Sequence, residues 1–231
     1  MPLITALLFW LTTLATIGIF YHAMTNAEAP LTKKKSSVIT LVLLLWLIVQ
    51  ALITISGFYY KTILSDLPPK LVVFGVAPML LTIIILFSTR AGRSFIDSLP
   101  LKTLTWLHVI RLPVEIVLYL LFLQKVVPLV MTFEGRNFDI LMGISAPLVA
   151  YYGFIGSSPN KKLLLIWNVV GIFLLLNIVI HALLSVPGPL QRFGFERPNI
   201  AVVQYPYSWL PTFIVPVVLF SHLVAIRRLT R

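Results

Sequence analysis

Three ionisable side chains and a tyrosine lie in an apolar stretch where a charge is costly. His108, Arg111, Glu115 and Tyr119 are spaced by three, four and four residues. At 3.6 residues per turn they form one stripe on a helix, which must face protein or water rather than lipid. An ionisable residue at the middle of a membrane helix costs about 2.5–3.5 kcal/mol on insertion scales. The stripe therefore predicts an intramembrane polar site.

Two interpretations of the stripe remain open. In the first it binds a solute or a coupling ion. In the second Arg111 and Glu115 only neutralise each other, as a polar lock that makes insertion tolerable. An arginine that precedes a glutamate is the weaker orientation for a pair within one helix. This order favours partners on other helices.

A second set of polar residues is expected at one end of the bundle, on the outer face. It combines acids, arginines and asparagines from two segments: Glu134, Arg136, Asn137, Asp139, Glu196, Arg197 and Asn199. Asn137 or Asp139 is placed to cap the helix that follows, and a helix N-terminus joined by an arginine can bind an anion. The set predicts an outer vestibule for a solute, although loops at a membrane surface are polar in any case.

Histidine is the remaining residue that could hold a cofactor. His22, His108 and His222 fall at similar depths in their helices, so they are candidates for a metal site, and His108 with His222 for a haem site. No two of these histidines are three or four residues apart in the sequence, the spacing that would indicate a specific metal or haem site. Neither cofactor is therefore predicted. The chain has no cysteine, which excludes disulfides, thiolate metal sites and a cysteine nucleophile.

These residues are carried by long apolar segments. The chain has 231 residues, of which 59% are hydrophobic and 11% charged, and its mean hydropathy is +0.99. A soluble domain is about a quarter charged, so the composition predicts an all-α integral membrane protein. Spans of about 20 residues are expected near 3–22, 38–57, 71–88, 103–124, 138–155, 163–185 and 208–226. The whole chain, 1–231, would be one transmembrane domain without a soluble domain.

The basic residues predict the orientation of this bundle. Alternate loops, beginning with 23–37, carry eleven of them: Lys33, Lys34, Lys35, Arg90, Arg93, Lys102, Lys161, Lys162, Arg227, Arg228 and Arg231. The other loops carry six: Lys61, Lys70, Lys125, Arg136, Arg192 and Arg197. Lysine and arginine concentrate on the cytoplasmic side. We therefore expect seven helices with the N-terminus outside and the C-terminus inside, in a cell membrane (the inner membrane of a Gram-negative bacterium).

The net charge of +11 is spread over short clusters between apolar runs rather than gathered on one basic face. Nucleic acid is therefore not an expected partner; the lipid bilayer and a small solute are.

Prolines mark two further features. Pro187, Pro189, Pro198 and Pro206 disfavour helix in the long segment 186–207. Pro78 and Pro216 fall at similar places in the third and seventh spans, but too little else matches to predict a repeat.

Three functions remain compatible with the sequence. The leading hypothesis is a small transporter or permease, with Arg111 meeting an anionic group and Glu115 or His108 exchanging a proton. The first alternative is a membrane-embedded enzyme, or a haem or metal protein, using His108 and His222. No triad spacing or nucleotide loop supports an enzyme. The second alternative is a structural or accessory membrane subunit.

Overall fold

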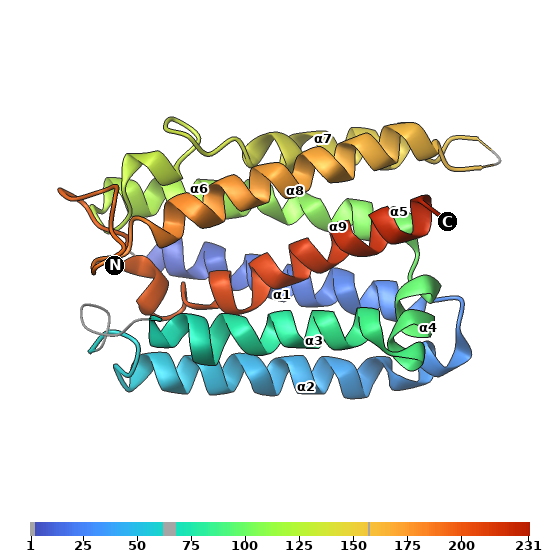
Figure 1. Cartoon of the computed structure of the whole chain (residues 1–231), viewed down its shortest axis with the longest axis horizontal. Coiled ribbons are helices and arrows are strands. Elements are labelled where there is room, and N and C mark those ends of the chain that lie inside the picture. The colour runs from blue at the N-terminus through green and yellow to red at the C-terminus, as the bar shows by residue number, and fades with distance from the viewer. Residues whose placement is uncertain (1–2, 62–67, 157) are drawn as a thin grey trace.

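The computed structural model describes residues 3–61, 68–156 and 158–231, and every regular element in them is helical (Figure 1). The α-helices are α1 (Leu3–Thr25), α2 (Pro30–Ile55), α3 (Ala77–Ser88), α4 (Arg90–Ser98), α5 (Leu101–Leu107), α6 (Arg111–Leu123), α7 (Ile140–Tyr152), α8 (Lys161–Leu183) and α9 (Val215–Leu229). Five shorter helical turns are η1 (Val72–Val76), η2 (His108–Ile110), η3 (Leu129–Met131), η4 (Ala201–Val203) and η5 (Leu210–Ile214).

The all-α prediction is confirmed, and each predicted span coincides with a helical segment. Among the residues that the structure describes, five helices are long and apolar enough to cross a membrane: Leu3–Thr25, Pro30–Ile55, Leu101–Leu123, Lys161–Leu183 and Leu210–Leu229. A sixth candidate is Val72–Ser88, which continues into α4 after a bend of 94°. The segment predicted as the fifth span, 138–155, contains only the 13-residue helix α7. The structure therefore has five or six candidate spans.

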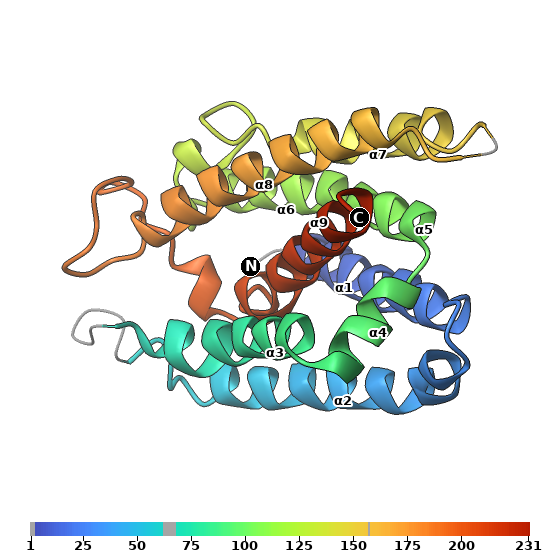
Figure 2. The same cartoon turned by 45° about the vertical axis from the view of Figure 1, so that its right-hand side comes forward.

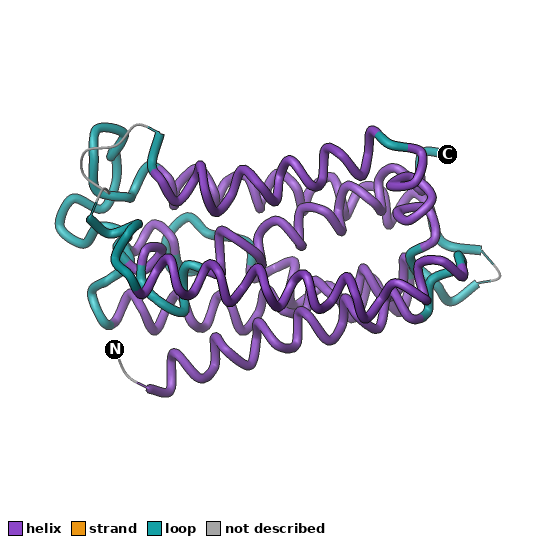
Figure 3. The backbone as a smooth tube through the Cα atoms, turned by 90° about the horizontal axis from the view of Figure 1, so that it is seen from below, coloured by secondary structure: helices purple, strands orange, loops and turns teal. Residues whose placement is uncertain are grey.

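The helices form an elongated bundle with loops gathered at its two ends (Figure 3). The two termini lie at opposite ends (Figure 1). Helix α9 runs through the middle, with α8 on one side and α3 on the other (Figure 2). Many large apolar side chains on α2, such as Leu41, Leu45 and Leu52, remain exposed. An outer surface of this kind is suited to lipid.

Two proline bends determine how α3 and α9 begin. Each helix is preceded by a π-helical turn, η1 or η5, and Pro78 or Pro216 follows one residue into the helix. A proline has no N–H for the carbonyl four residues earlier. That leaves the carbonyls of Phe74 and Thr212 without their normal helical partner.

Both carbonyls accept a hydrogen bond from α2 instead. Gln50 Nε2 donates to Phe74 O at 3.1 Å, and Trp46 Nε1 donates to Thr212 O at 2.9 Å. Trp46 and Gln50 are one helical turn apart, so a single face of α2 serves both bends. The two turns also pack against each other, because a Cβ atom at Gly75 would lie 2.4 Å from Thr212 Cγ2. We call this arrangement the proline clamp.

The proline clamp leads to a first prediction about stability. Gln50→Leu removes the donor to Phe74 O and also the acceptor of the Tyr59 hydroxyl, which donates to Gln50 Oε1 at 2.6 Å. Each buried polar group left without a partner costs about 1–3 kcal/mol. We expect Gln50→Leu to be the more destabilising substitution and Trp46→Phe, which removes one donor, the less. Denaturation in detergent micelles measures this, with the exposed Val49→Ala as control. Equal stability of all three variants would contradict the clamp.

Candidate functional site

The candidate span Leu101–Leu123 is interrupted where its charges lie. Helix α5 ends at Leu107, the 3₁₀ turn η2 follows, and α6 starts at Arg111 with Pro113 in its first turn. His108, Arg111 and Glu115 are all buried, with exposures of 0%, 2% and 1%. The predicted stripe therefore turns into the protein, and it does so near the middle of the span.

Arg111 on α6 is bound by residues of three other elements. Its Nε donates to Asp139 Oδ2 at 2.6 Å, and its Nη2 donates to Asp139 Oδ1, so the ion pair is bidentate. Its Nη1 donates to His222 Nε2 on α9 at 2.9 Å, and Nη2 also lies 3.5 Å from the carbonyl of Gly171 on α8. Thus α6, α8, α9 and the start of α7 meet at one guanidinium group.

The hydrogen bonds of His222 define its tautomer. A guanidinium group can only donate, so His222 Nε2 must accept from Arg111. The proton then sits on Nδ1, which donates to Asn168 Oδ1 at 2.8 Å. Asn168 Nδ2 donates to the Leu164 carbonyl at 2.8 Å, which fixes the amide in the orientation this requires. Neutral His222 is thereby held against Arg111.

Gly171 makes this arrangement possible. A Cβ atom at residue 171 would lie 2.3 Å from His222 Cε1 and 2.6 Å from its Nε2. Only a glycine lets α8 approach the imidazole this closely.

Glu115 has a different partner. Both carboxyl oxygens of Glu115 lie 2.7 Å from Asn137 Nδ2, which also donates to the Met131 carbonyl at 3.0 Å. Asn137 Oδ1 accepts from the backbone N–H of Asp139 at 3.0 Å. Asn137 therefore joins the carboxyl group of Glu115 to the ion pair of Arg111. Arg111, Glu115, Asn137, Asp139, Asn168 and His222 are together called the polar cluster.

Helix α7 begins inside the polar cluster. Asp139 is its N-cap residue, but the side chain makes no capping bond and binds Arg111 instead, while Asn137 accepts from the Asp139 amide. Helix α7 has 13 residues, a length of roughly 20 Å, and a membrane core is about 30 Å thick. The segment from Gln124 to Asp139 returns along the bundle, so that α7 covers only the half nearer the C-terminus (Figure 1).

His108 lies beside the polar cluster. Its ring stacks on that of His222, with centroids 3.9 Å apart, and meets the edge of Trp167 at 5.2 Å. Neither ring nitrogen has a hydrogen-bond partner among the described residues. The two histidines proposed as haem ligands therefore converge, but rings in face contact leave no room for a porphyrin between them.

The three histidines considered for a metal do not form one group. His22 is exposed near the end of α1, where its ring lies 3.2 Å from Asn26 Nδ2. Within residues 3–61, 68–156 and 158–231, no three His, Asp or Glu side chains are placed to share a metal ion.

The residues predicted at the outer face separate into two groups. Asn137 and Asp139 enter the polar cluster, because the segment that carries them turns inward. The other five remain near the loops. Glu134 contacts Tyr119, and Glu196 is exposed. The guanidinium group of Arg136 lies over the ring of Phe193, and that of Arg197 lies over the ring of Phe122. Asn199 is buried and donates a hydrogen bond to the Ala182 carbonyl. Tyr119, the last residue of the stripe, contacts Glu134 and Phe133, neither of which belongs to the polar cluster.

Asn168 is the cluster member that the sequence did not predict. Its spacing of three residues from Gly171 places both on the face of α8 that meets α9. That spacing was the available signal. Asn177 lies elsewhere and donates to the Arg136 carbonyl.

Fold and site together define an all-helical protein with five or six apolar candidate spans around a buried group of charges. Residues 67–230, more than half of the chain, match the family described as "Domain of unknown function (DUF8737)". The chain belongs to this family, and the matched region contains the whole polar cluster. No curated protein and no solved structure matches the chain.

Proposed function

We propose that the chain is an integral membrane protein of seven crossings, with the N-terminus outside and the C-terminus inside. In this topology the segment from Gln124 to Asp139 and helix α7 make one crossing together. The eleven-to-six distribution of basic residues supports the orientation. The exposed apolar surface supports the membrane location.

The topology can be tested with single cysteines, since the chain has none of its own. Lys34→Cys and Ser158→Cys are expected inside, and Ser56→Cys and Arg192→Cys outside. A membrane-impermeant maleimide added to intact cells should label only the second pair. Labelling of Ser158→Cys with the outer pair would show that α7 does not complete a crossing.

Within this topology the chain is a small transporter whose solute site is the polar cluster. The observation that carries the proposal is the start of α7 at Asp139, halfway along the bundle and beside Arg111. Irregular backbone at membrane depth is tolerated only where protein or a water-filled cavity covers it. Many transporters bind solutes where such half-helices begin.

The roles of the side chains follow from their charges. Asp139 is the counter-ion of Arg111 in the arrangement described, and an anionic solute group takes its place during transport. Glu115 has no cationic partner of its own among the described ion pairs, and its one side-chain donor is Asn137. It is the group that gains or loses the coupling proton.

A second candidate is an accessory subunit in which the polar cluster is only a structural lock. The partners that Arg111 already has favour this candidate: its guanidinium group binds Asp139, His222 and Gly171, and the residue is 2% exposed. A lock needs no access from water, whereas a transporter does.

A stabilisation screen separates the two candidates. The purified protein is heated with a panel of small carboxylates, phosphate and sulfate. A solute at about 100 times its Kd stabilises a folded protein by about 2.7 kcal/mol. The transporter predicts a shift for at least one anion in the wild type and none in Arg111→Leu. No shift with any anion would favour the accessory subunit.

A further inference from the structure

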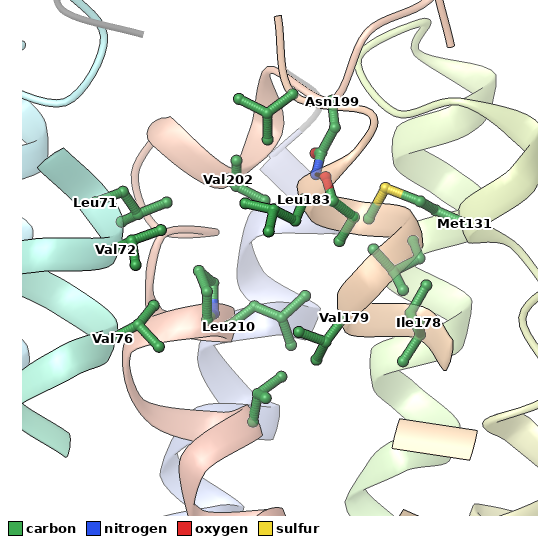
Figure 4. A pocket seen from close by; sticks show the side chains of 15 residues that line it. Leu71, Val72, Val76, Met131, Ile178, Val179, Leu183, Asn199, Val202 and Leu210 are labelled. Atoms are coloured by element: carbon green, nitrogen blue, oxygen red, sulfur yellow. Dashed lines mark hydrogen bonds between the residues drawn. The ribbon is translucent and has the colours of Figure 1, made fainter. Parts of the chain in front are cut away.

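A cleft opens between η1 and α8, at the end of the bundle where the segment 184–209 lies. Its volume is about 220 Å³. Val72 and Val76 form one wall and Val179 and Leu183 the other, with Asn199 at one end (Figure 4). Among the residues that line it, Asn199 alone is polar. An apolar cleft on the side of such a bundle accepts a hydrocarbon chain.

The Asn199 side chain is held in place by hydrogen bonds, and one of its polar atoms has no hydrogen-bond partner among the described residues. Its side chain is fully buried, its Nδ2 donates to the Ala182 carbonyl at 3.2 Å, and its backbone N–H donates to the Ser185 carbonyl at 2.8 Å. Asn199 Oδ1 accepts from none of the described residues.

Buried polar atoms without partners are uncommon and call for an explanation. Here the atom without a partner is an acceptor, Asn199 Oδ1, and it belongs to the one polar residue that lines the cleft. A bound hydroxyl group satisfies this acceptor by donating one hydrogen bond to it.

We propose that this cleft binds a membrane amphiphile with an uncharged hydroxyl headgroup. Its chain lies between η1 and α8, and its hydroxyl group donates to Asn199 Oδ1. No lining residue carries a charge, so an anionic or cationic headgroup gains nothing here. The site does not depend on the transport proposal, because none of the polar cluster residues lines the cleft.

The test uses two photoreactive probes in phosphatidylcholine nanodiscs. One is a long-chain primary alcohol with a diazirine in mid-chain, and the other is its methyl ether. The ether keeps the chain and the oxygen but cannot donate to Asn199 Oδ1. One hydrogen bond to a buried acceptor corresponds to a preference of about tenfold. We expect the alcohol to label residues 178–186 and 210–215 about ten times more than the ether.

Variants separate the headgroup contact from the cleft itself. Asn199→Leu should remove the preference for the alcohol, and Val179→Phe, which fills the cleft, should suppress labelling by both probes. Val170→Phe, on an exposed part of α8, is the matched control and should change neither. The comparison of the two probes on the wild type needs no variant and remains decisive if Asn199→Leu does not fold. Equal labelling by both probes, in the wild type and in a folded Asn199→Leu, would overturn the proposal and leave only ordinary lipid contact.

Discussion

Arg111→Leu and Asp139→Leu, made singly, are each expected to lower the free energy of unfolding by about 3–5 kcal/mol, because each leaves a buried charge without its counter-ion. The ion pair is bidentate and both side chains are buried. The double variant Arg111→Leu/Asp139→Leu removes both charges and should lose far less than the sum of the single variants. Reversible denaturation in detergent micelles measures all three.

A surface ion pair provides the control for this cycle. Asp97 pairs with Arg227 at 3.0 Å and with Arg231 at 2.6 Å, at the end of the bundle and in partial contact with solvent. Such pairs contribute about 0–1 kcal/mol, so Asp97→Asn should be nearly neutral. Additive losses for Arg111→Leu and Asp139→Leu would mean that the two charges do not depend on each other.

Glu115→Gln is expected to remove function while the protein stays folded. Glutamine has the same shape, its oxygen still accepts from Asn137 Nδ2 once its NH2 group turns away from that donor, and the substitution leaves no group that can be ionised. The melting temperature should therefore remain near that of the wild type. Uptake into proteoliposomes, measured with a stabilising anion from the screen, should be lost because no proton can be exchanged.

Glu115→Leu is the matched variant for this experiment. It leaves the Asn137 amide without one of its acceptors, so we expect a loss of about 1–3 kcal/mol. If Glu115→Gln unfolds as readily as Glu115→Leu, the carboxyl group has a structural role and the lock is favoured.

Apolar runs of about 20 residues predicted the helices well, since nearly every residue of a span contributes to that signal. The helical period of 3.6 residues placed His108, Arg111 and Glu115 on one stripe. The order of Arg111 before Glu115 indicated partners on other helices, and the structure gives Arg111 partners at the start of α7 and on α9. These features depend on neighbouring residues of a single helix.

The inward turn of the segment from Gln124 to Asp139 was not predictable in this way. Asn137 and Asp139 resemble ordinary surface residues at the entrance of a helix, and the sequence placed them in an outer vestibule. Their position in the polar cluster depends on the length of α7 and on distant partners: Arg111 lies 28 residues before Asp139, and Glu115 lies 22 residues before Asn137. Similarly, Asn168 binds His222 only because α8 packs against α9, 54 residues later. Hydropathy carries no information about such contacts.

The proline clamp shows the same limit. Pro78 and Pro216 stood at similar places in the sequence, but the surrounding residues did not match. The structure pairs the two bends through Trp46 and Gln50, which lie on a third helix. Contacts among three segments leave no pattern within any one of them.

The most direct test of the central claim, that Arg111 is an anion site reachable from water, is chemical rescue of Asp139→Ala. This variant removes the carboxylate and leaves space beside the guanidinium group. We expect acetate or formate to raise its melting temperature with increasing concentration, by more than in the wild type, where the Asp139 carboxylate competes for Arg111, and not at all in Asp139→Ala/Arg111→Leu. If neither anion stabilises Asp139→Ala, the polar cluster is closed to water and the transport proposal is wrong.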